Sequence, residues 1–372
     1  MSGKPTICLC MIVRDEAHII RRCLESVAPY IDHYAICDTG SIDDTCVVAR
    51  AFMRDVGIPG KVYHHAWQDF GRNRTLALEA AANTHCEFTL VIDADEVLVV
   101  EDPTVLEGLF FDAYRVEMRF PNISYPRVNL MRSARNFRYV GVIHEYATCD
   151  PVAPEYLLDP AKIHMWTDGD GARGRSGTKL ARDVATMEAW IENEPENPRA
   201  WFYLAQGYET IGQPDKAINA YLKRITMGDY PAEVWFSHYR IAMLYAMRPA
   251  YWTLARNHFL LAYEHSPHRA EPLFFLAVGH HKLQQDHMAL LYLEAATLLE
   301  KPTGDLFVED TVYHHLMHVQ YVICLHNCGK HEEARLTARE LLQLDRVPPE
   351  YRTMIEAIAQ KTVAPDPVPA GV

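Results

Sequence analysis

The pattern of apolar and polar positions changes near the middle of the chain. In the first half, short apolar runs alternate with segments in which apolar residues recur every three or four positions. The strand-like runs cover residues 6–13, 34–37, 61–66 and 88–92. Strands and helices that alternate at this spacing are typical of parallel βαβ units. We therefore predict an α/β domain with a largely parallel sheet.

Residues 114–145 show a different pattern, because polar and apolar positions alternate and Pro121 and Pro126 interrupt the stretch. This pattern predicts mixed or antiparallel strands. Six arginines lie within it: Arg115, Arg119, Arg127, Arg132, Arg135 and Arg138. They form either a solvated strand face or a positive wall for a phosphate or an acidic acceptor.

From residue 184 onward the pattern is helical, with Trp, Tyr, Leu and Ala at fixed offsets. Trp201 and Trp235 are 34 residues apart, as are Ala255 and Ala289. This period resembles that of tetratricopeptide repeats. We predict a first domain over residues 1–183, a helical repeat domain over 184–360, and a flexible tail over 361–372.

Composition limits the possible functions. A chain of 372 residues exceeds the usual size of a single core, so two domains are expected. The formal charge, 36 − 49 = −13, disfavours a large nucleic-acid interface. Nine cysteines without a Cys-x-x-Cys pair indicate free thiols in a reducing, cytoplasmic compartment, and no structural zinc is expected. Neither a signal peptide nor a transmembrane segment is predicted.

The histidines of the second half are interpreted as solvated or capping residues. His314 and His318 are four residues apart, a spacing that permits metal binding, but the sequence suggests no carboxylate or cysteine partner for them.

Charged residues follow the strand-like runs of the first half. The carboxyl edge of an open α/β sheet is where ligands bind. The residues expected there are Arg14, Asp15, Asp38, Arg72, Asn73, Asp93 and Asp95. Each alone could be a turn or cap residue, but together they indicate one site. Asp93 and Asp95 flank Ala94 and can reach a hard cation between them and a diphosphate. We predict a metal-assisted nucleotide-sugar site, and we interpret Glu96 as a turn residue facing away.

Several segments resemble glycosyltransferase family 2 proteins of the GT-A fold, in the subgroup with a helical-repeat tail. The matching segments are 7–16, 22–27, 38–41, 70–73 and 93–96. The resemblance covers most of residues 5–183. It implies a Rossmann-like nucleotide-sugar-binding domain followed by an all-α tetratricopeptide-repeat solenoid, and an inverting, single in-line displacement.

The resemblance also implies residue roles. Arg14, Asp15 and Asp38 would hold the nucleotide base and ribose of the donor. Asp95 would bind the divalent metal directly, and Asp93 would assist it through water. Oxygen ligands favour Mg²⁺ or Mn²⁺, and the donor would be a nucleoside-diphosphate sugar, foremost a UDP-sugar.

The segment 141–145 resembles the Val-His-Glu motif of the family. An isolated His-Glu pair would more often be structural, but in this context we predict Glu145 as general base. Either His144 or His164 could ligate the metal. Family members usually have His-Tyr-Gly where this chain has His164, Met165 and Trp166.

Residues 167–178 form either a plain linker or a lid beside Lys179 and Arg182. As a lid it would close on the diphosphate, which Lys179 or Arg72 would hold.

The predicted reaction is a hexosyltransferase-like transfer of a sugar to a hydroxyl or thiol. The acceptor would be a peptide, a glycan or another macromolecule held by the repeats, which could also form a homo-oligomer. Two alternatives remain open. One is a non-catalytic repeat scaffold with a degenerate sugar-nucleotide-binding domain. The other is a nucleotidyltransferase, although residues 13–17 lack the glycine-rich phosphate loop of that chemistry.

Overall fold

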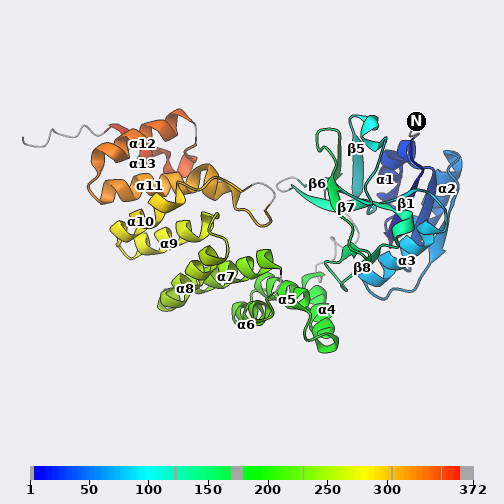
Figure 1. Cartoon of the computed structure of the whole chain (residues 1–372), viewed down its shortest axis with the longest axis horizontal. Helices are drawn as coiled ribbons and strands as arrows, with labels where there is room; N and C mark the ends of the chain where they lie inside the picture. Colours follow the sequence, from blue (N-terminus) through cyan, green and yellow to red (C-terminus); the bar gives the residue numbers. More distant parts are fainter. Residues whose placement is uncertain are drawn as a thin grey trace, which may run out of the picture. The chain divides into compact units, whose positions relative to one another are not determined.

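The computed structural model describes residues 4–120, 124–168, 179–228, 230–302, 305–344 and 346–360. The chain divides into two compact units, Met1–Asn193 and Glu194–Val372 (Figure 1). The division lies ten residues beyond the position predicted from the sequence, because a helix at the start of the expected repeat domain packs on the first unit.

Four parallel strands form the first part of the sheet. These are β1 (Ile7–Val13), β2 (His33–Asp38), β3 (Gly60–His64) and β4 (Phe88–Val91), in the spatial order β3-β2-β1-β4. All pairings among them are parallel, which confirms the predicted βαβ arrangement. The chain moves outward from β1 to β3 and then returns to the other side of β1. The direction of winding therefore reverses between β1 and β4, where such sheets bind ligands.

The sheet continues with strands of mixed direction. These are β5 (Glu96–Val100), β6 (Ala113–Arg119), β7 (Ser124–Arg132), β10 (Glu155–Leu157) and β11 (Ile163–Thr167). Strand β7 is antiparallel to both β4 and β6, as predicted for this region. The order continues β4-β7-β6-β11-β5, so β5 is the far edge although it follows β4 directly in the chain. The short connection requires the sheet to curl, which brings β5 back to α1 (Ile20–Val27) (Figure 1).

Helices cover both faces of the parallel strands. The side chains of β1 alternate, so Ile7, Leu9 and Met11 share a core with α1 and with α2 (Thr45–Asp55). Cys8 and Cys10 point to the opposite face and pack with the alanines of α3 (Phe70–Ala82). The buried cysteines of the first unit therefore act as small apolar residues.

A two-stranded sheet of β8 (Arg138–Val140) and β9 (Tyr146–Thr148) lies beside α3. Helix α4 (Lys179–Asn193) also belongs to this unit. The ring of Trp190 lies so close to Gly141 that a Cβ on that glycine would be 3.3 Å from it. This contact explains why the unit ends after α4 and not before it.

The second unit consists of helices that pack on their neighbours in the chain (Figure 1). They are α5 (Pro198–Thr210), α6 (Pro214–Thr226), α7 (Pro231–Ala246), α8 (Trp252–His265), α9 (Glu271–Lys282), α10 (Asp286–Ala296), α11 (Met317–Asn327), α12 (His331–Gln343) and α13 (Pro349–Gln360). Proline begins four of them, where its missing N–H costs nothing. Stacked helical hairpins of this kind confirm the predicted all-α repeat architecture.

Shorter helical segments connect these elements. They are η1 (Ala28–Tyr30), η2 (Pro103–Leu106), η3 (Ser133–Arg135), η4 (Pro249–Tyr251) and the π-helical η5 (Val312–Leu316).

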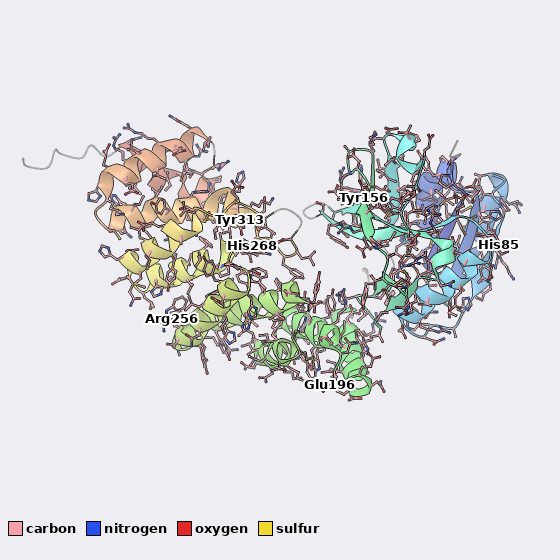
Figure 2. The ribbon with its side chains drawn as sticks, in the orientation of Figure 1. His85, Tyr156, Glu196, Arg256, His268 and Tyr313 are labelled. Atoms are coloured by element: carbon pink, nitrogen blue, oxygen red, sulfur yellow. The ribbon has the colours of Figure 1, made fainter. Side chains whose placement is uncertain are left out.

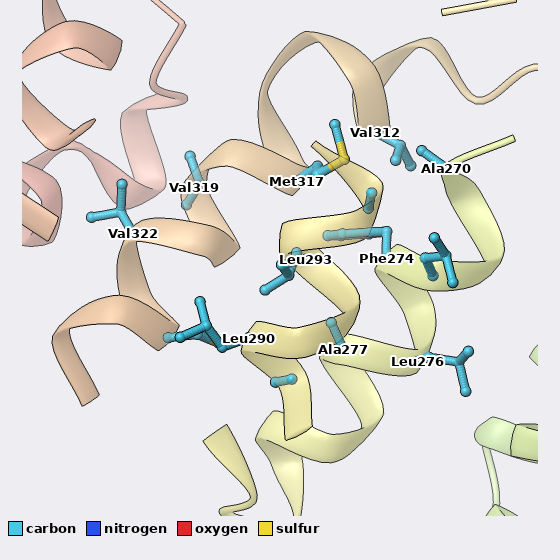
Figure 3. Packing of buried hydrophobic residues seen from close by; sticks show 14 of the residues in the cluster. Ala270, Phe274, Leu276, Ala277, Leu290, Leu293, Val312, Met317, Val319 and Val322 are labelled. Atoms are coloured by element: carbon cyan, nitrogen blue, oxygen red, sulfur yellow. The ribbon is translucent and has the colours of Figure 1, made fainter. Parts of the chain in front are cut away.

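A continuous core runs through the repeats from α7 to α13. Figure 3 shows Phe274 and Ala277 of α9 facing Leu293 of α10, with Met317 at the start of α11 beside them. Tyr313, labelled in Figure 2, donates a hydrogen bond to Glu271 Oε2 over 2.5 Å. Adjacent hairpins therefore share both apolar and polar contacts. Among the described residues, no helix is long and apolar enough to cross a membrane.

Candidate active site

The loops that follow β1 and β2 are joined by hydrogen bonds at the carboxyl edge of the sheet. The backbone N–H of Asp15 donates to Ser41 Oγ over 3.0 Å, and the N–H of Ile42 donates to Asp15 Oδ1 over 2.8 Å. Asp15 has a φ of +57°, a left-handed conformation in which Asp is tolerated. Arg14 follows the end of β1, and its side chain is about half exposed. Arg14, Asp15 and the loop after Asp38 thus lie together.

Asp38 is almost fully buried at the end of β2. Its carboxylate accepts hydrogen bonds from the N–H groups of Gly40 and Ser41, over 3.3 and 3.0 Å. Nδ1 of His64, the residue opposite it on β3, lies 3.2 Å from its Oδ2 atom. Burial would raise the pKa of Asp38, but the hydrogen bonds from Ser41, His64 and Gly40 outweigh it and lower that pKa. Asp38 therefore remains ionised and fixed in position.

Asp93 lies in the turn between β4 and β5, and Arg74 of α3 holds its carboxylate. The Nη1 and Nη2 atoms of Arg74 lie 2.8 Å from Oδ1 and Oδ2 of Asp93, respectively. Both carboxylate oxygens are thereby engaged. Only 11% of the Arg74 side chain and 25% of the Asp93 side chain are exposed, so this pair lies largely out of water.

Arg74 also contacts Glu145. Its Nε atom donates to Glu145 Oε1 over 2.6 Å, and 12% of the Glu145 side chain is exposed. The contact depends on a close approach of α3 to the segment before Glu145. A Cβ at Gly71 would lie 2.2 Å from the carbonyl oxygen of Gly141, so only glycine fits there. Arg74 therefore connects Asp93 with Glu145.

Glu96 is buried in the same site, and our interpretation of it as a residue facing away was wrong. Its Oε2 atom accepts the backbone N–H of Asp93 over 2.9 Å and lies 2.7 Å from Nη2 of Arg127. Nη1 of Arg127 lies 3.7 Å from Oδ2 of Asp93. The chain turns between the end of β4 and the start of β5, and this turn directs the Glu96 side chain into the site. The charges alternate from Glu145 through Arg74, Asp93 and Arg127 to Glu96.

Burial and charge act in opposite directions on these acids. For Asp93, burial would raise the pKa, but Arg74 and Arg127 outweigh it and lower that pKa. For Glu96, burial is the largest effect and raises the pKa, the negative charge of Asp93 adds to it, and Arg127 opposes it. Asp93 is therefore the acid of this pair that stays ionised most readily.

Asp95 lies in the same turn and is partly exposed. Its backbone carbonyl accepts a hydrogen bond from Nη2 of Arg22 over 3.2 Å. The Sγ atom of Cys23 donates to the carbonyl oxygen of Asp93 over 3.3 Å. Helix α1 therefore supports the backbone of the acidic turn.

Some predicted residues do not join this cluster. Arg72 precedes Arg74 by two positions, so it points to a different side of α3, is half exposed and lies near Glu79. Asn73 is buried, and its amide is used inside the protein: Oδ1 accepts the N–H of Gln68 and Nδ2 donates to the carbonyl of Ala66. The Asn73 side chain therefore stabilises the loop before α3.

His164 is also separated from the acidic turn. The strand register places Thr167 opposite Glu96 and His164 opposite Val99. Three residues of strand correspond to about 10 Å. Burial lowers the pKa of His164, and the positive charge of Arg119 adds to this effect. The structure therefore does not bring His164 to Asp93 and Asp95.

The remaining predicted residues lie elsewhere. The exposed His144 has a φ of +52°, and its neighbour Glu145 points inward. Lys179 is the first residue of α4, but its side chain and residues 169–178 of the predicted lid lie outside the described residues. Arg182 is exposed on α4.

Arg74 and Arg127 are the residues that sequence reasoning missed. Arg127 belongs to the arginine-rich stretch, and each arginine there has a carboxylate within 4.0 Å. The pairs are Arg115–Glu155, Arg119–Glu117, Arg127–Glu96, Arg132–Asp112, Arg135–Asp112 and Arg138–Asp150. The arginines of residues 115–138 are therefore neither simply solvated nor a wall of unpaired positive charge. No sequence signal distinguished Arg127, whose partner is an acid of the site.

Residues 8–110 match the family model for glycosyl transferase family 2. The match identifies a glycosyl transferase family 2 domain within the first unit. A TPR repeat-containing protein of Synechococcus elongatus is 31% identical over 208 residues, which are 51% of this chain and 49% of that protein. Glycosyltransferase SunS, from a prophage of Bacillus subtilis, is 24% identical over 238 residues, 60% of this chain and 54% of SunS. The chain spans about half the length of these relatives.

Among solved structures, that of MamA covers 45% of this chain and 90% of its own, at 15% identity and a TM-score of 0.37. A likeness of that degree decides nothing about this protein. The family model therefore identifies the glycosyltransferase family 2 domain. The repeat architecture of the second unit follows from the order and packing of its helices.

Proposed function

We propose that this protein transfers a hexose from a nucleoside-diphosphate sugar, foremost a UDP-sugar, to a hydroxyl or thiol acceptor with the help of a divalent cation. The observation that carries the proposal is the convergence of Asp93 and Glu145 on Arg74 at the carboxyl edge of the sheet, with Asp95 two residues further along the acidic turn. Such an edge is the usual ligand site of α/β sheets.

The donor nucleotide is assigned to the loops after β1 and β2. Asp38 is ionised and held by three hydrogen-bond donors, so its carboxylate can accept a hydrogen bond from the base or the ribose without reorganising. Arg14 and Asp15 lie on the adjoining loop and complete this part of the site. Lys179 and Arg182 of α4 supply positive charge for the diphosphate.

The acidic turn fits a hard cation, since its exposed donors are carboxylate oxygens. When bound, Mg²⁺ or Mn²⁺ would neutralise the charge that develops on the departing diphosphate. Asp95 would hold the ion directly, because both oxygens of Asp93 are engaged by Arg74. Asp93 would orient the turn and contact the ion through water. We do not include His164 in this ligand set, given its distance along β11.

Glu145 is the proposed general base. Arg74 fixes its carboxylate, so Glu145 would take a proton from the acceptor hydroxyl or thiol as the new bond to the anomeric carbon forms. Attack from the side opposite the diphosphate would invert the anomeric centre. The acceptor would be a peptide, a glycan or another macromolecule held by the repeat unit, in the cytoplasm, and the repeats could also support a homo-oligomer.

One observation favours a second function. Arg74 occupies both oxygens of Asp93, which also suits a domain that binds a sugar nucleotide without turning it over. In that case the protein would be a repeat scaffold whose first unit recruits or senses a nucleotide sugar.

A donor panel separates these functions. The full chain is incubated with individual nucleotide sugars and Mn²⁺, and both the melting temperature and donor hydrolysis are measured. We expect one donor to raise the melting temperature and to be hydrolysed, and Asp95→Asn to lose the metal-stimulated hydrolysis. The matched control is Asp102→Asn, which alters a partly exposed aspartate that caps η2.

Stabilisation by a donor without hydrolysis would favour the scaffold. Metal-stimulated hydrolysis that is unchanged in Asp95→Asn would refute the proposed role of Asp95.

A further inference from the structure

Three helices of the repeat unit bring together a histidine, an aspartate and a cysteine. His281 lies near the end of α9, Asp286 is the first residue of α10, and Cys324 lies in α11. Nδ1 of His281 is 2.5 Å from Oδ1 of Asp286, and Sγ of Cys324 is 3.6 Å from the same oxygen. All three ligand atoms lie within 4.8 Å of one another.

The fold of the repeats explains this arrangement. Helices α9 and α10 form a hairpin whose turn contains Gln284 at a φ of +59°, so the end of one helix meets the start of the next. Helix α11 begins the following hairpin and packs on α10. Cys324 is fully buried, whereas 31% of the His281 side chain and 20% of the Asp286 side chain are exposed. The cluster has a buried end and a side open to solvent.

We propose that His281, Asp286 and Cys324 bind one zinc ion that joins adjacent hairpins of the repeat unit. Nitrogen, oxygen and sulfur are the three donor types that zinc accepts, at about 2.0–2.3 Å. Two ligands of one tetrahedral zinc ion lie about 3.3–3.7 Å apart at these bond lengths. The distance from Sγ of Cys324 to Oδ1 of Asp286 already fits this range, whereas Nδ1 of His281 must move away from the same oxygen by about 1 Å. Water can occupy the fourth position on the exposed side.

The competing interpretation is that hydrogen bonds alone connect the adjacent hairpins at this cluster. Nδ2 of Asn327 donates to Oδ2 of Asp286 over 3.1 Å, and the Cys324 thiol donates to Oδ1. Asp286 is thus satisfied without an ion, and an experiment must distinguish the two cases.

Proton release is a consequence of the zinc site. Burial raises the pKa of Cys324 to about 12, so the thiol is protonated before an ion binds. On binding, the S–H bond breaks, a sulfur–zinc bond forms and the proton passes to the buffer. His281 binds through Nδ1, so the proton that Nδ1 donates to Asp286 in the ion-free protein moves to Nε2, or to the buffer if Nε2 already carries one. Zinc affinity should therefore fall as the pH is lowered.

Cobalt provides a direct test, because Co²⁺ bound to a thiolate has a charge-transfer absorption that oxygen ligands alone do not produce. The full chain is stripped of metal under reducing conditions and titrated with Co²⁺ and then Zn²⁺. We expect the thiolate absorption to appear and to be displaced by Zn²⁺. It should be lost in Cys324→Ala and retained in Asp95→Asn, so the result does not depend on transferase activity.

A second pair of variants covers the case in which Cys324→Ala does not fold. His281→Gln changes a partly exposed side chain and should weaken Zn²⁺ binding about tenfold or more. His287→Gln changes the exposed histidine beside Asp286 and should bind Zn²⁺ as the unmodified protein does. The proposal is overturned if the unmodified protein shows no thiolate absorption, or if His281→Gln and His287→Gln bind Zn²⁺ equally.

Discussion

The guanidinium of Arg74 holds the carboxylate of Asp93 with both terminal nitrogens, each 2.8 Å from its own oxygen. Its third nitrogen, Nε, contacts Glu145 over 2.6 Å. A single arginine thus positions the aspartate of the acidic turn and the proposed base. Lysine could not replace it, because an ammonium group lacks this planar fork. The relative placement of the two acids depends on α3 and not on the strands that precede them.

Arg74→Met should destabilise the first unit by about 3–5 kcal/mol, since it leaves two largely buried carboxylates without their partner. Hydrogen exchange of the amides in β1 and β4 measures this loss. The control, Arg72→Met, changes a half-exposed side chain on another side of the helix and should shift the free energy by no more than about 0.5 kcal/mol. Equal effects of the two variants would contradict the assigned role of Arg74.

Glu145→Gln keeps an oxygen that can accept the Arg74 hydrogen bond but cannot take up a proton. We expect donor binding to persist in calorimetry, while the rate of transfer falls about 10²–10⁴-fold. Glu155→Gln, which changes an exposed glutamate paired with Arg115, is the control and should leave the rate unchanged. If Glu145→Gln abolishes donor binding, Glu145 belongs to the donor site and is not the base.

Gly71→Ala tests the close approach of α3 to the segment that carries Glu145. Its Cβ would lie 2.2 Å from the backbone carbonyl of Gly141, which cannot rotate away. We expect a loss of about 1–3 kcal/mol in stability and a lower transfer rate, because Arg74 and Glu145 move apart.

The control for this change is Gly212→Ala in the repeat unit. Gly212 has a φ of +73° and no atom within 4 Å of a built Cβ. It should lose about 1 kcal/mol of stability through backbone strain alone, with an unchanged transfer rate. A transfer rate in Gly71→Ala that equals that of the unmodified protein would contradict this account.

His238 of α7 makes the repeat unit sensitive to acid. Burial, with smaller effects from His258 and His265, lowers its pKa from 6.5 to about 4. Between these values the unfolded chain binds a proton that the folded chain does not. The stabilising contribution of the neutral residue is therefore complete above pH 6.5 and is lost as the pH falls toward 4. At about 1.4 kcal/mol per pH unit, the loss is about 3 kcal/mol.

Hydrogen exchange in α7 and α8, corrected for intrinsic rates, measures this decline. His238→Gln should reduce the slope, because glutamine does not titrate. Burial also lowers the pKa of His258 on α8, so part of the slope should remain. His268→Gln is the control, because His268, labelled in Figure 2, is exposed and should leave the slope in α7 and α8 unchanged. Its ring lies 2.8 Å from Asp305 Oδ2. A slope in His238→Gln equal to that of the unmodified protein would show that other groups cause the acid sensitivity.

Local patterns in the sequence were sufficient to predict the order of the first strands and helices and the start of the helical repeats. Apolar runs marked β1, β2 and β4, because a strand buried on both faces must be apolar throughout. Strand β3 lies at the edge of the sheet and is largely exposed, so its run is of mixed polarity. The 34-residue period marked the helical hairpins, because each must bury the same face against its neighbour. The acidic turn at Asp93 and Asp95 was also predictable, since charge directly after a buried strand has to lie at the sheet edge.

Tertiary structure decided which side chains meet. Arg74 and Arg72 are indistinguishable in the sequence, but the phase of α3 and the close approach at Gly71 direct only Arg74 toward Asp93. Glu96 turns inward because the curled sheet brings Arg127 to it. His164 lies away from the turn because of the register of β11. The cluster of His281, Asp286 and Cys324 likewise spans 44 residues and forms only when hairpins stack. Such contacts depend on strand order and helix rotation, which local periodicity does not encode.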